Sequence, residues 1–133
     1  MNLAQVLHQR WAADAALNSA LPAGRVFTGP SVDPNTPFAV ITRRSARPRT
    51  HFGDGSGIDT VAVRVEVFDE SYDAAAAVVH ALSGAFDGVT FDLAGANRVL
   101  IMQRRDESEH QSVDGVWRLT VDFDCTVYFD SGA

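Results

Sequence analysis

Ser56 comes closer than any other residue of the chain to a catalytic nucleophile, because it lies among glycines in the sequence GDGSG. A nucleophile elbow has the pattern G-x-S-x-G, and here Asp54 occupies the place of its first glycine. The segment also lacks the spaced acidic ligands and the distal glutamate of a calcium-binding loop. Gly53, Gly55 and Gly57 instead favour a mobile or sharply turning hairpin, so we expect neither catalysis nor a bound metal there.

The other side chains that could bind a metal or attack a substrate are scattered along the chain. A zinc site on a helix needs two ligands three or four positions apart, and no such pair exists among His8, His51, His80 and His110. The single Cys125 cannot form an internal disulfide, and it falls among the inward-facing residues of a strand, where it would pack as a small apolar side chain. We therefore expect no metal, no cofactor and no catalytic thiol.

Asp122 and Asp124 stand two positions apart in the same expected strand, so both project from one of its faces. Two carboxylates can share acid and base roles only if burial raises a pKa. Thr120 and Thr126 beside them indicate a polar, solvated face. We expect a surface or a channel wall at this face, and no enzyme.

Four of the eleven arginines are concentrated between residues 43 and 49, and the chain has no lysine. These four are Arg43, Arg44, Arg47 and Arg49. They could hold phosphates, although Phe52 is the one aromatic residue beside them. We prefer a second interpretation, in which their guanidinium groups pair with carboxylates of a neighbouring copy, such as Asp106, Glu107 or Glu109.

Length and composition indicate one folded domain, residues 1–133. A chain of 133 residues with 46% hydrophobic residues can bury a single core. Its formal net charge of −6 repels nucleic acid and acidic membranes at long range, so any such contact must be local. No apolar run is long enough to span a membrane and the first residues have no secretory pattern, so we expect a cytoplasmic protein without a membrane partner.

The first half of the chain predicts a helix followed by a hairpin. Apolar residues at helical spacing predict a helix over residues 3–21, and a loop with a short extended piece at 26–27 follows it. A strand begins at Phe38, and strict alternation predicts another at 58–68. Between them, residues 43–57 are polar and glycine-rich, so we expect a projecting hairpin tip.

The second half predicts one helix and two or three strands. The helix covers residues 71–86 with Asp69 or Ser71 as its cap, and a turn with a short strand follows over 87–96. Strands are expected at 97–105 and 115–129, on either side of a polar run. The predicted fold is α+β in the order α-β-β-α-β-β, an antiparallel sheet of four to five strands with two helices packed on one face.

Taken in order, these segments resemble the tail terminator or tail-completion proteins, minor capsid proteins of long-tailed bacteriophages. The likeness spans nearly the whole chain and rests on LAQVLHQRWAADAALNSALPAGRVF, PFAVI, the glycine-rich hairpin, VAVRVEVFDESYDAAAAVVHAL and VDGVWRLTVDFDCTVYF. The resemblance implies a structural virion protein with no catalytic residues. It also implies a homohexameric ring that caps the tail tube and docks onto the head–tail connector protein, in the tail or neck of the virion, after assembly in the host cytoplasm.

The resemblance gives the arginines and the paired aspartates an expected place. The hairpin tip, with its four arginines and Phe52, would contact a neighbouring subunit or the tail tube protein. Asp122 and Asp124 would line a negative lumen through which DNA passes without specific binding. The crowded arginines depart from the family pattern, so a nucleic-acid-binding module remains open as an alternative, as does a small α+β enzyme.

Overall fold

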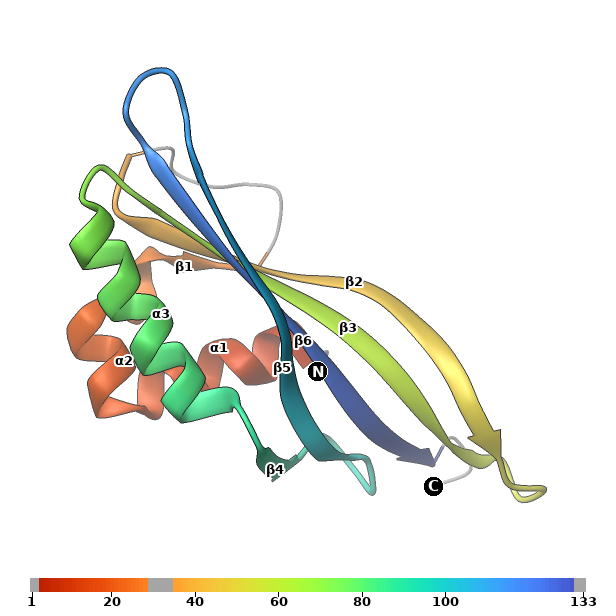
Figure 1. Cartoon of the computed structure of the whole chain (residues 1–133). Coiled ribbons are helices and arrows are strands. Elements are labelled where there is room, and N and C mark those ends of the chain that lie inside the picture. Colours follow the sequence, from red (N-terminus) through yellow and green to blue (C-terminus); the bar gives the residue numbers. More distant parts are fainter. Residues whose placement is uncertain (1–2, 29–34, 131–133) are drawn as a thin grey trace.

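A computed structural model describes residues 3–28 and 35–130 of the chain (Figure 1). Its sheet has six strands in the order β1-β2-β3-β6-β5-β4, antiparallel except for the β1–β2 pair. The helices are α1 (Leu3–Ala13), α2 (Ala15–Ala20), the 3-10 turn η1 (Ala23–Arg25) and α3 (Tyr72–Phe86). The strands are β1 (Val26–Phe27), β2 (Phe38–His51), β3 (Ser56–Asp69), β4 (Val89–Asp92), β5 (Arg98–Gln111) and β6 (Trp117–Asp130).

The α+β class is confirmed, whereas the predicted number of elements needs correction. The sheet is mixed and curled, with six strands rather than four or five, because the short extended piece at β1 joins it in parallel. Three α-helices are present among the described residues rather than two. The helix expected over residues 3–21 is interrupted at Asp14, which lies between α1 and α2.

The interruption at Asp14 has a local cause. Its carboxylate accepts a hydrogen bond from the backbone N–H of Leu17 at 3.0 Å, so the side chain caps a new helix. The indole Nε1 of Trp11 donates to the carbonyl of Leu21 at 2.8 Å and ties the end of α2 back to α1. Helix α1 therefore packs on β2 of the sheet, whereas α2 packs against α1 and α3 and buries Leu17.

Helix α3 begins where the sequence predicts. Ser71 is its N-cap, and its hydroxyl accepts a hydrogen bond from the N–H of Ala74 at 3.2 Å. One side of the helix is buried against β3, β5 and β6. The ring of Phe86 meets that of Phe123 edge to face, with centroids 6.4 Å apart.

The core lies between the helices and one face of the sheet (Figure 1). Strands β3 and β6 supply alternate residues to it: Val61, Val63, Val65, Val67, Leu119, Val121, Phe123, Cys125 and Val127. The residues between them project from the opposite face, which no helix among the described residues covers. We call this surface the helix-free face; it includes Arg64 and Glu66 on β3 and Asp122 and Asp124 on β6.

Two polar segments that were expected to be loops are strand. Residues 43–51 belong to β2 and residues 106–111 to β5, which leaves only residues 52–55 and 112–116 as turns. Each polar segment is hydrogen-bonded along one side to an apolar strand and is otherwise exposed, so it needs no apolar alternation of its own. The expected tip at 43–57 is therefore the distal part of the β2–β3 hairpin, and its arginines lie on a strand.

Candidate assembly surface

The arginine-rich segment forms an open edge of the sheet. β1 pairs with β2 only at Ala39 and Val40, so the outer side of residues 41–51 has no strand partner in the described part of the chain. We call these residues the arginine edge. Two register shifts interrupt their pairing with β3, and Pro48 has no N–H to donate. Such features limit uncontrolled strand addition at an edge.

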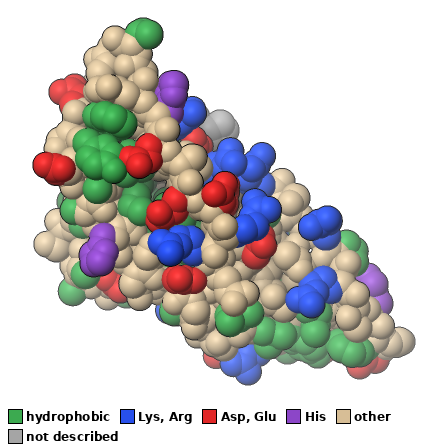
Figure 2. All heavy atoms as spheres, in the orientation of Figure 1, with side chains coloured by type: hydrophobic (Ala, Val, Ile, Leu, Met, Phe, Trp, Pro, Cys, Tyr) green, Lys and Arg blue, Asp and Glu red, His purple; other side chains and the backbone are tan. Residues whose placement is uncertain are grey.

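The four arginines of this edge are not held by close contacts within the described residues, and Arg44 acts on Asp122 through its charge alone. Arg43, Arg44, Arg47 and Arg49 are all exposed, and none forms an ion pair or a side-chain hydrogen bond there. Arg44, Arg47 and Arg105 surround a hollow of about 270 Å³ that also includes Asp124. Figure 2 shows basic side chains spread across the part of the molecule formed by the sheet. The edge is therefore available to an acidic surface of another molecule.

The turn that joins β2 to β3 is held by its own polar groups. Gly55 has a positive φ of 91°, which favours glycine, and the N–H of Phe52 donates to the carbonyl of Ser56 at 2.9 Å. The hydroxyl and the N–H of Ser56 both donate to the Asp54 carboxylate, and these bonds lower the pKa of Asp54. Ser56 itself is buried, and the Phe52 side chain is 45% exposed.

Gly57 serves close packing rather than the turn. A Cβ atom at this position would lie 2.7 Å from the carbonyl oxygen of Thr50 and 2.8 Å from the ring of Phe129. A side chain here would therefore push β2 away from β3. Gly57 was expected to belong to the hairpin tip, because a glycine required for close packing cannot be told from a turn glycine by sequence alone.

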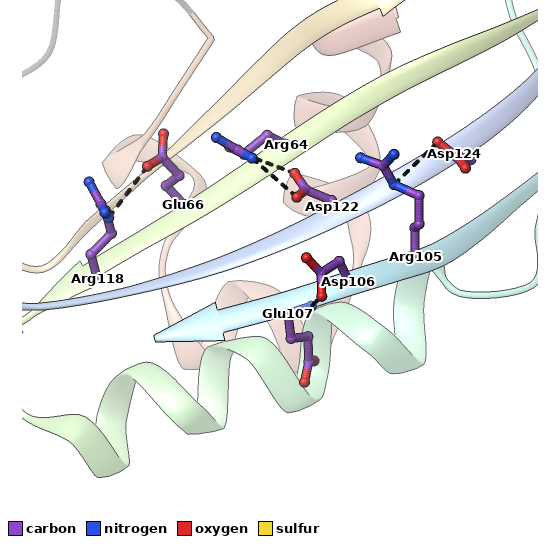
Figure 3. A network of polar contacts seen from close by, with 8 residues as sticks. All are labelled: Arg64, Glu66, Arg105, Asp106, Glu107, Arg118, Asp122 and Asp124. Carbon is purple, nitrogen blue, oxygen red and sulfur yellow. Dashed lines mark hydrogen bonds and ion pairs between the residues drawn. The ribbon is translucent and has the colours of Figure 1, made fainter. Parts of the chain in front are cut away.

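Ion pairs cross the helix-free face between neighbouring strands (Figure 3). Arg64 binds the Asp122 carboxylate through both Nε and Nη2, at 2.8 and 3.2 Å. This hydrogen bonding lowers the pKa of Asp122 and raises the pKa of Arg64. Looser pairs lie on either side, Arg118 with Glu66 at 3.8 Å and Arg105 with Asp124 at 3.7 Å.

Asp122 and Asp124 thus differ from the solvated carboxylates that the sequence suggested. Asp122 is only 6% exposed and is neutralised by Arg64 across the β3–β6 pair. Asp124 is partly exposed and faces Arg105. The partners are 58 and 19 positions away in the chain, so spacing within the last strand could not reveal them.

A second surface lies between the start of α3 and the distal half of β5, where two of the carboxylates suggested as arginine partners, Glu107 and Glu109, line a groove that the sequence did not predict. This acidic groove, of about 530 Å³, is lined by Tyr72, Ala76, Val79, Glu107, Ser108, Glu109, Leu119 and Thr120. A hydrogen bond with Glu109 raises the pKa of the Tyr72 hydroxyl, and the charges of Glu109, Asp73 and Glu107 raise it further. The sequence signal for this groove is the pair of glutamates two positions apart, Glu107 and Glu109, which project from one face of β5.

Groups suited to chemistry are few in the described residues. No cluster of three or more His, Cys, Asp or Glu side chains that could hold a metal ion occurs there. No helix found there is long and apolar enough to span a membrane. Cys125 is buried, and burial raises its pKa to about 12, so its thiol stays protonated.

The described residues thus form a small α+β fold in which the outer side of β2 beyond Val40 has no strand partner. The family model of tail completion protein gp17 matches residues 5–128, and the chain belongs to this family. No curated protein matches the sequence.

The fold is also similar to a solved structure. That chain belongs to the virion of a native gene transfer agent particle; the two share 15% identity over 96% of this chain and 95% of the other, with a TM-score of 0.75. At this identity the likeness shows the fold. The family match confirms the resemblance to tail-completion proteins, and the chain is a structural tail protein.

Proposed function

We propose that this protein is a tail terminator, in which identical copies form a ring, most simply a homohexamer, that caps the tail tube and joins it to the head–tail connector. Family membership supports the tail location. The observation that carries the ring is that the described part of the sheet has two open edges of different charge, one with four arginines and one on which three carboxylates outnumber Arg104 and Arg105. One is the arginine edge on β2, and the other is the outer side of β5 beyond Met102, where Asp106, Glu107 and Glu109 lie.

Two different surfaces on opposite edges suit a head-to-tail contact. Strands β3 and β6 separate β2 from β5, so the basic and the acidic edge of one copy cannot meet each other. When each copy offers one edge to the next and receives the other, the same contact repeats and a rotation can close it into a ring. In this arrangement the four arginines of the arginine edge would contact the neighbouring subunit or the tail tube. They are Arg43, Arg44, Arg47 and Arg49.

The turn and the helix-free face would meet the other partners. The exposed ring of Phe52 lies at the end of the hairpin, where it could contact a neighbouring subunit or the tail tube. Asp122 and Asp124 on the helix-free face would line the lumen. Because Arg64 and Arg105 offset their charges, DNA would pass this wall without specific binding. The ring would assemble in the host cytoplasm and remain in the neck of the virion, without enzymatic activity or a cofactor.

The test is the assembly state of the purified full chain, measured by native mass spectrometry and negative-stain imaging, alone and with the tail tube protein. We expect closed rings of uniform copy number that bind tube ends and limit tube length. A chain that stays monomeric at every concentration and leaves tube growth unchanged would overturn the proposal.

The unpaired arginines make DNA binding the alternative to exclude. At physiological salt we expect a Kd for duplex DNA no tighter than about 10⁻⁴ M, the weak end of non-specific binding, because the whole chain is acidic. Fluorescence anisotropy with a labelled duplex measures it. Micromolar binding that disappears in an Arg47→Ser/Arg49→Ser variant would favour a nucleic-acid-binding module instead.

A further inference from the structure

We infer that the acidic groove is a receptor for one particular side chain, Arg43 of the neighbouring copy. This inference rests on the proposed ring and adds to it the place where the arginine edge docks. Two carboxylates line the groove, those of Glu107 and Glu109, and the charge of Asp73 outside the lining also acts on the Tyr72 hydroxyl. One arginine, Arg104, partly compensates this charge, since its guanidinium lies 3.0 Å from Glu107. The groove therefore keeps an excess of negative charge.

The rest of the groove also suits an arginine. Its apolar lining includes Ala76, Val79 and Leu119, which can cover the aliphatic part of an arginine side chain. Tyr72 is 40% exposed and packs edge to face on Trp117 with ring centroids 4.9 Å apart. Carboxylates beside an aromatic ring and an apolar lining form a favourable environment for a guanidinium group.

The chain itself limits which cation can fill this site in a homo-oligomer. It contains no lysine, so the side chains that stay fully charged at neutral pH are arginines. Elsewhere in the described residues the arginines are engaged: Arg64, Arg98, Arg104, Arg105 and Arg118 form ion pairs, Arg10 lies 4.4 Å from the centre of the Phe91 ring, and Arg25 binds backbone carbonyls. The four arginines of the arginine edge remain.

Register and position together select Arg43 among the four. Arg44 falls in a register shift and lines the hollow that contains Asp124 of the helix-free face. Arg43 lies opposite Val63, a core residue, so it projects from the helix-bearing side of the open β2 edge. Glu107 and Glu109 lie opposite the core residues Val121 and Leu119, so they project from the same side of the open β5 edge. Arg47 lies opposite Thr60 and projects from the helix-free face.

Position along the strands agrees with this selection. Val63 is paired with Phe123, which is two residues from the Glu107 partner Val121. When two copies meet edge to edge at the same level, Arg43 and Glu107 are therefore offset by about 7 Å, a distance that an arginine side chain can bridge. Arg49 lies much nearer the β2–β3 turn and would require a large stagger.

Charge reversal with rescue tests the site, with association measured by native mass spectrometry and analytical ultracentrifugation at fixed salt. We expect Arg43→Glu alone and Glu107→Arg/Glu109→Arg alone each to weaken association by about tenfold or more, because like charges then face each other. The chain carrying all three changes should recover association, which would also show that the two separate variants fail through charge and not through folding. Glu70→Arg, at an exposed acidic residue outside the groove, is the control for reversing one acidic charge and should assemble normally.

The outcomes separate this inference from the proposed function. If the parent chain forms rings and Arg43→Glu forms them equally well, the groove is not the receptor and the ring proposal stands. If the single variants fail and the combined variant does not recover, the groove assignment is likewise wrong. If the parent chain never assembles, the ring proposal itself fails.

Discussion

Asp122 is a buried carboxylate whose partner lies on the next strand. It is 6% exposed, and Arg64 binds both of its oxygens. In an Asp122→Asn variant the Arg64 guanidinium would lose its counter-charge while its surroundings stay partly buried. We expect the free energy of unfolding to fall by about 1–3 kcal/mol, measured by urea denaturation. Asp124→Asn, which breaks a longer and more exposed pair, should cost at most about 1 kcal/mol. If the two variants lost the same free energy of unfolding, the buried, two-atom contact of Arg64 with Asp122 would add nothing to stability.

The same pair predicts a pH dependence. The pKa of Asp122 is lowered in the folded state, so its contribution to stability is present above the ordinary carboxyl pKa of about 3.9 and is lost as pH falls through the folded value. The stability advantage of the parent chain over Asp122→Asn should therefore be constant between pH 7 and pH 5 and shrink below about pH 4. Urea titrations at pH 7, 5 and 3 measure this difference. An advantage that persists unchanged at pH 3 would contradict the assignment.

Cys125 gives a simpler test at the same scale. Its pKa of about 12 leaves roughly one thiol in 10⁴ ionised at pH 8, and the side chain is fully buried. A thiol-specific reagent should therefore label the folded chain very slowly and the urea-unfolded chain at once. Rapid labelling of the folded chain would show that β6 opens to solvent.

At the scale of elements, the β2–β3 hairpin contains a natural pair of test positions. A Cβ atom at Gly57 would meet the Thr50 carbonyl and the Phe129 ring, whereas one at Gly53 would meet nothing within 4 Å. We expect Gly57→Ala to lower the free energy of unfolding by about 1–3 kcal/mol through overpacking, measured by thermal or urea denaturation. Gly53→Ala should stay within about 0.5 kcal/mol of the parent chain. A neutral Gly57→Ala would mean that the two strands are less closely packed than described.

Elements with a strong apolar period could be predicted from the sequence, and those without one could not. The valines of β3, the apolar residues of β6 and the cap of α3 are at the predicted places. The polar distal halves of β2 and β5 were taken for loops because their strand character comes from hydrogen bonds to a neighbouring strand. Asp14 divided a helix although the apolar stripe continued through it, since a side-chain cap competes locally with the helical period.

The candidate assembly surface could likewise be predicted only in part from the sequence. The cluster of arginines was visible in the sequence, because charge density along a chain needs no fold. The pairing of Arg64 with Asp122 and the gathering of Tyr72, Glu107 and Glu109 depend on strand register and on where α3 lies. Neither strand register nor the position of α3 can be read from composition, so the ion pair and the groove became visible only in the structure.

At the scale of the whole molecule, the charge is distributed unevenly. The chain has a net charge of −6, yet the four arginines of the described part that no close contact holds lie along one sheet edge, and carboxylates gather at the opposite edge. Such a molecule repels its copies at long range and attracts them only where the two edges face each other. Association should therefore be selective for the head-to-tail orientation.

The last prediction concerns this edge as a whole. Replacing Arg43, Arg44, Arg47 and Arg49 together with serine removes four exposed side chains that no close contact holds among the described residues, so the melting temperature should barely change. Ring formation, or docking onto the tail tube, should weaken strongly because the attracting charge is gone. Parent rings should also weaken as salt rises, whereas the variant should respond less to salt.

An Arg98→Ser/Arg118→Ser variant is the control for that prediction, since both arginines are exposed and lie outside the arginine edge. It changes the net charge in the same direction and should assemble nearly as the parent chain does. Calorimetry measures the folding of each variant, and native mass spectrometry with tube-capping assays measures assembly. If the quadruple variant forms rings and completes tails like the parent at moderate salt, the arginine edge is not an assembly contact, and the clustered charge must serve another partner.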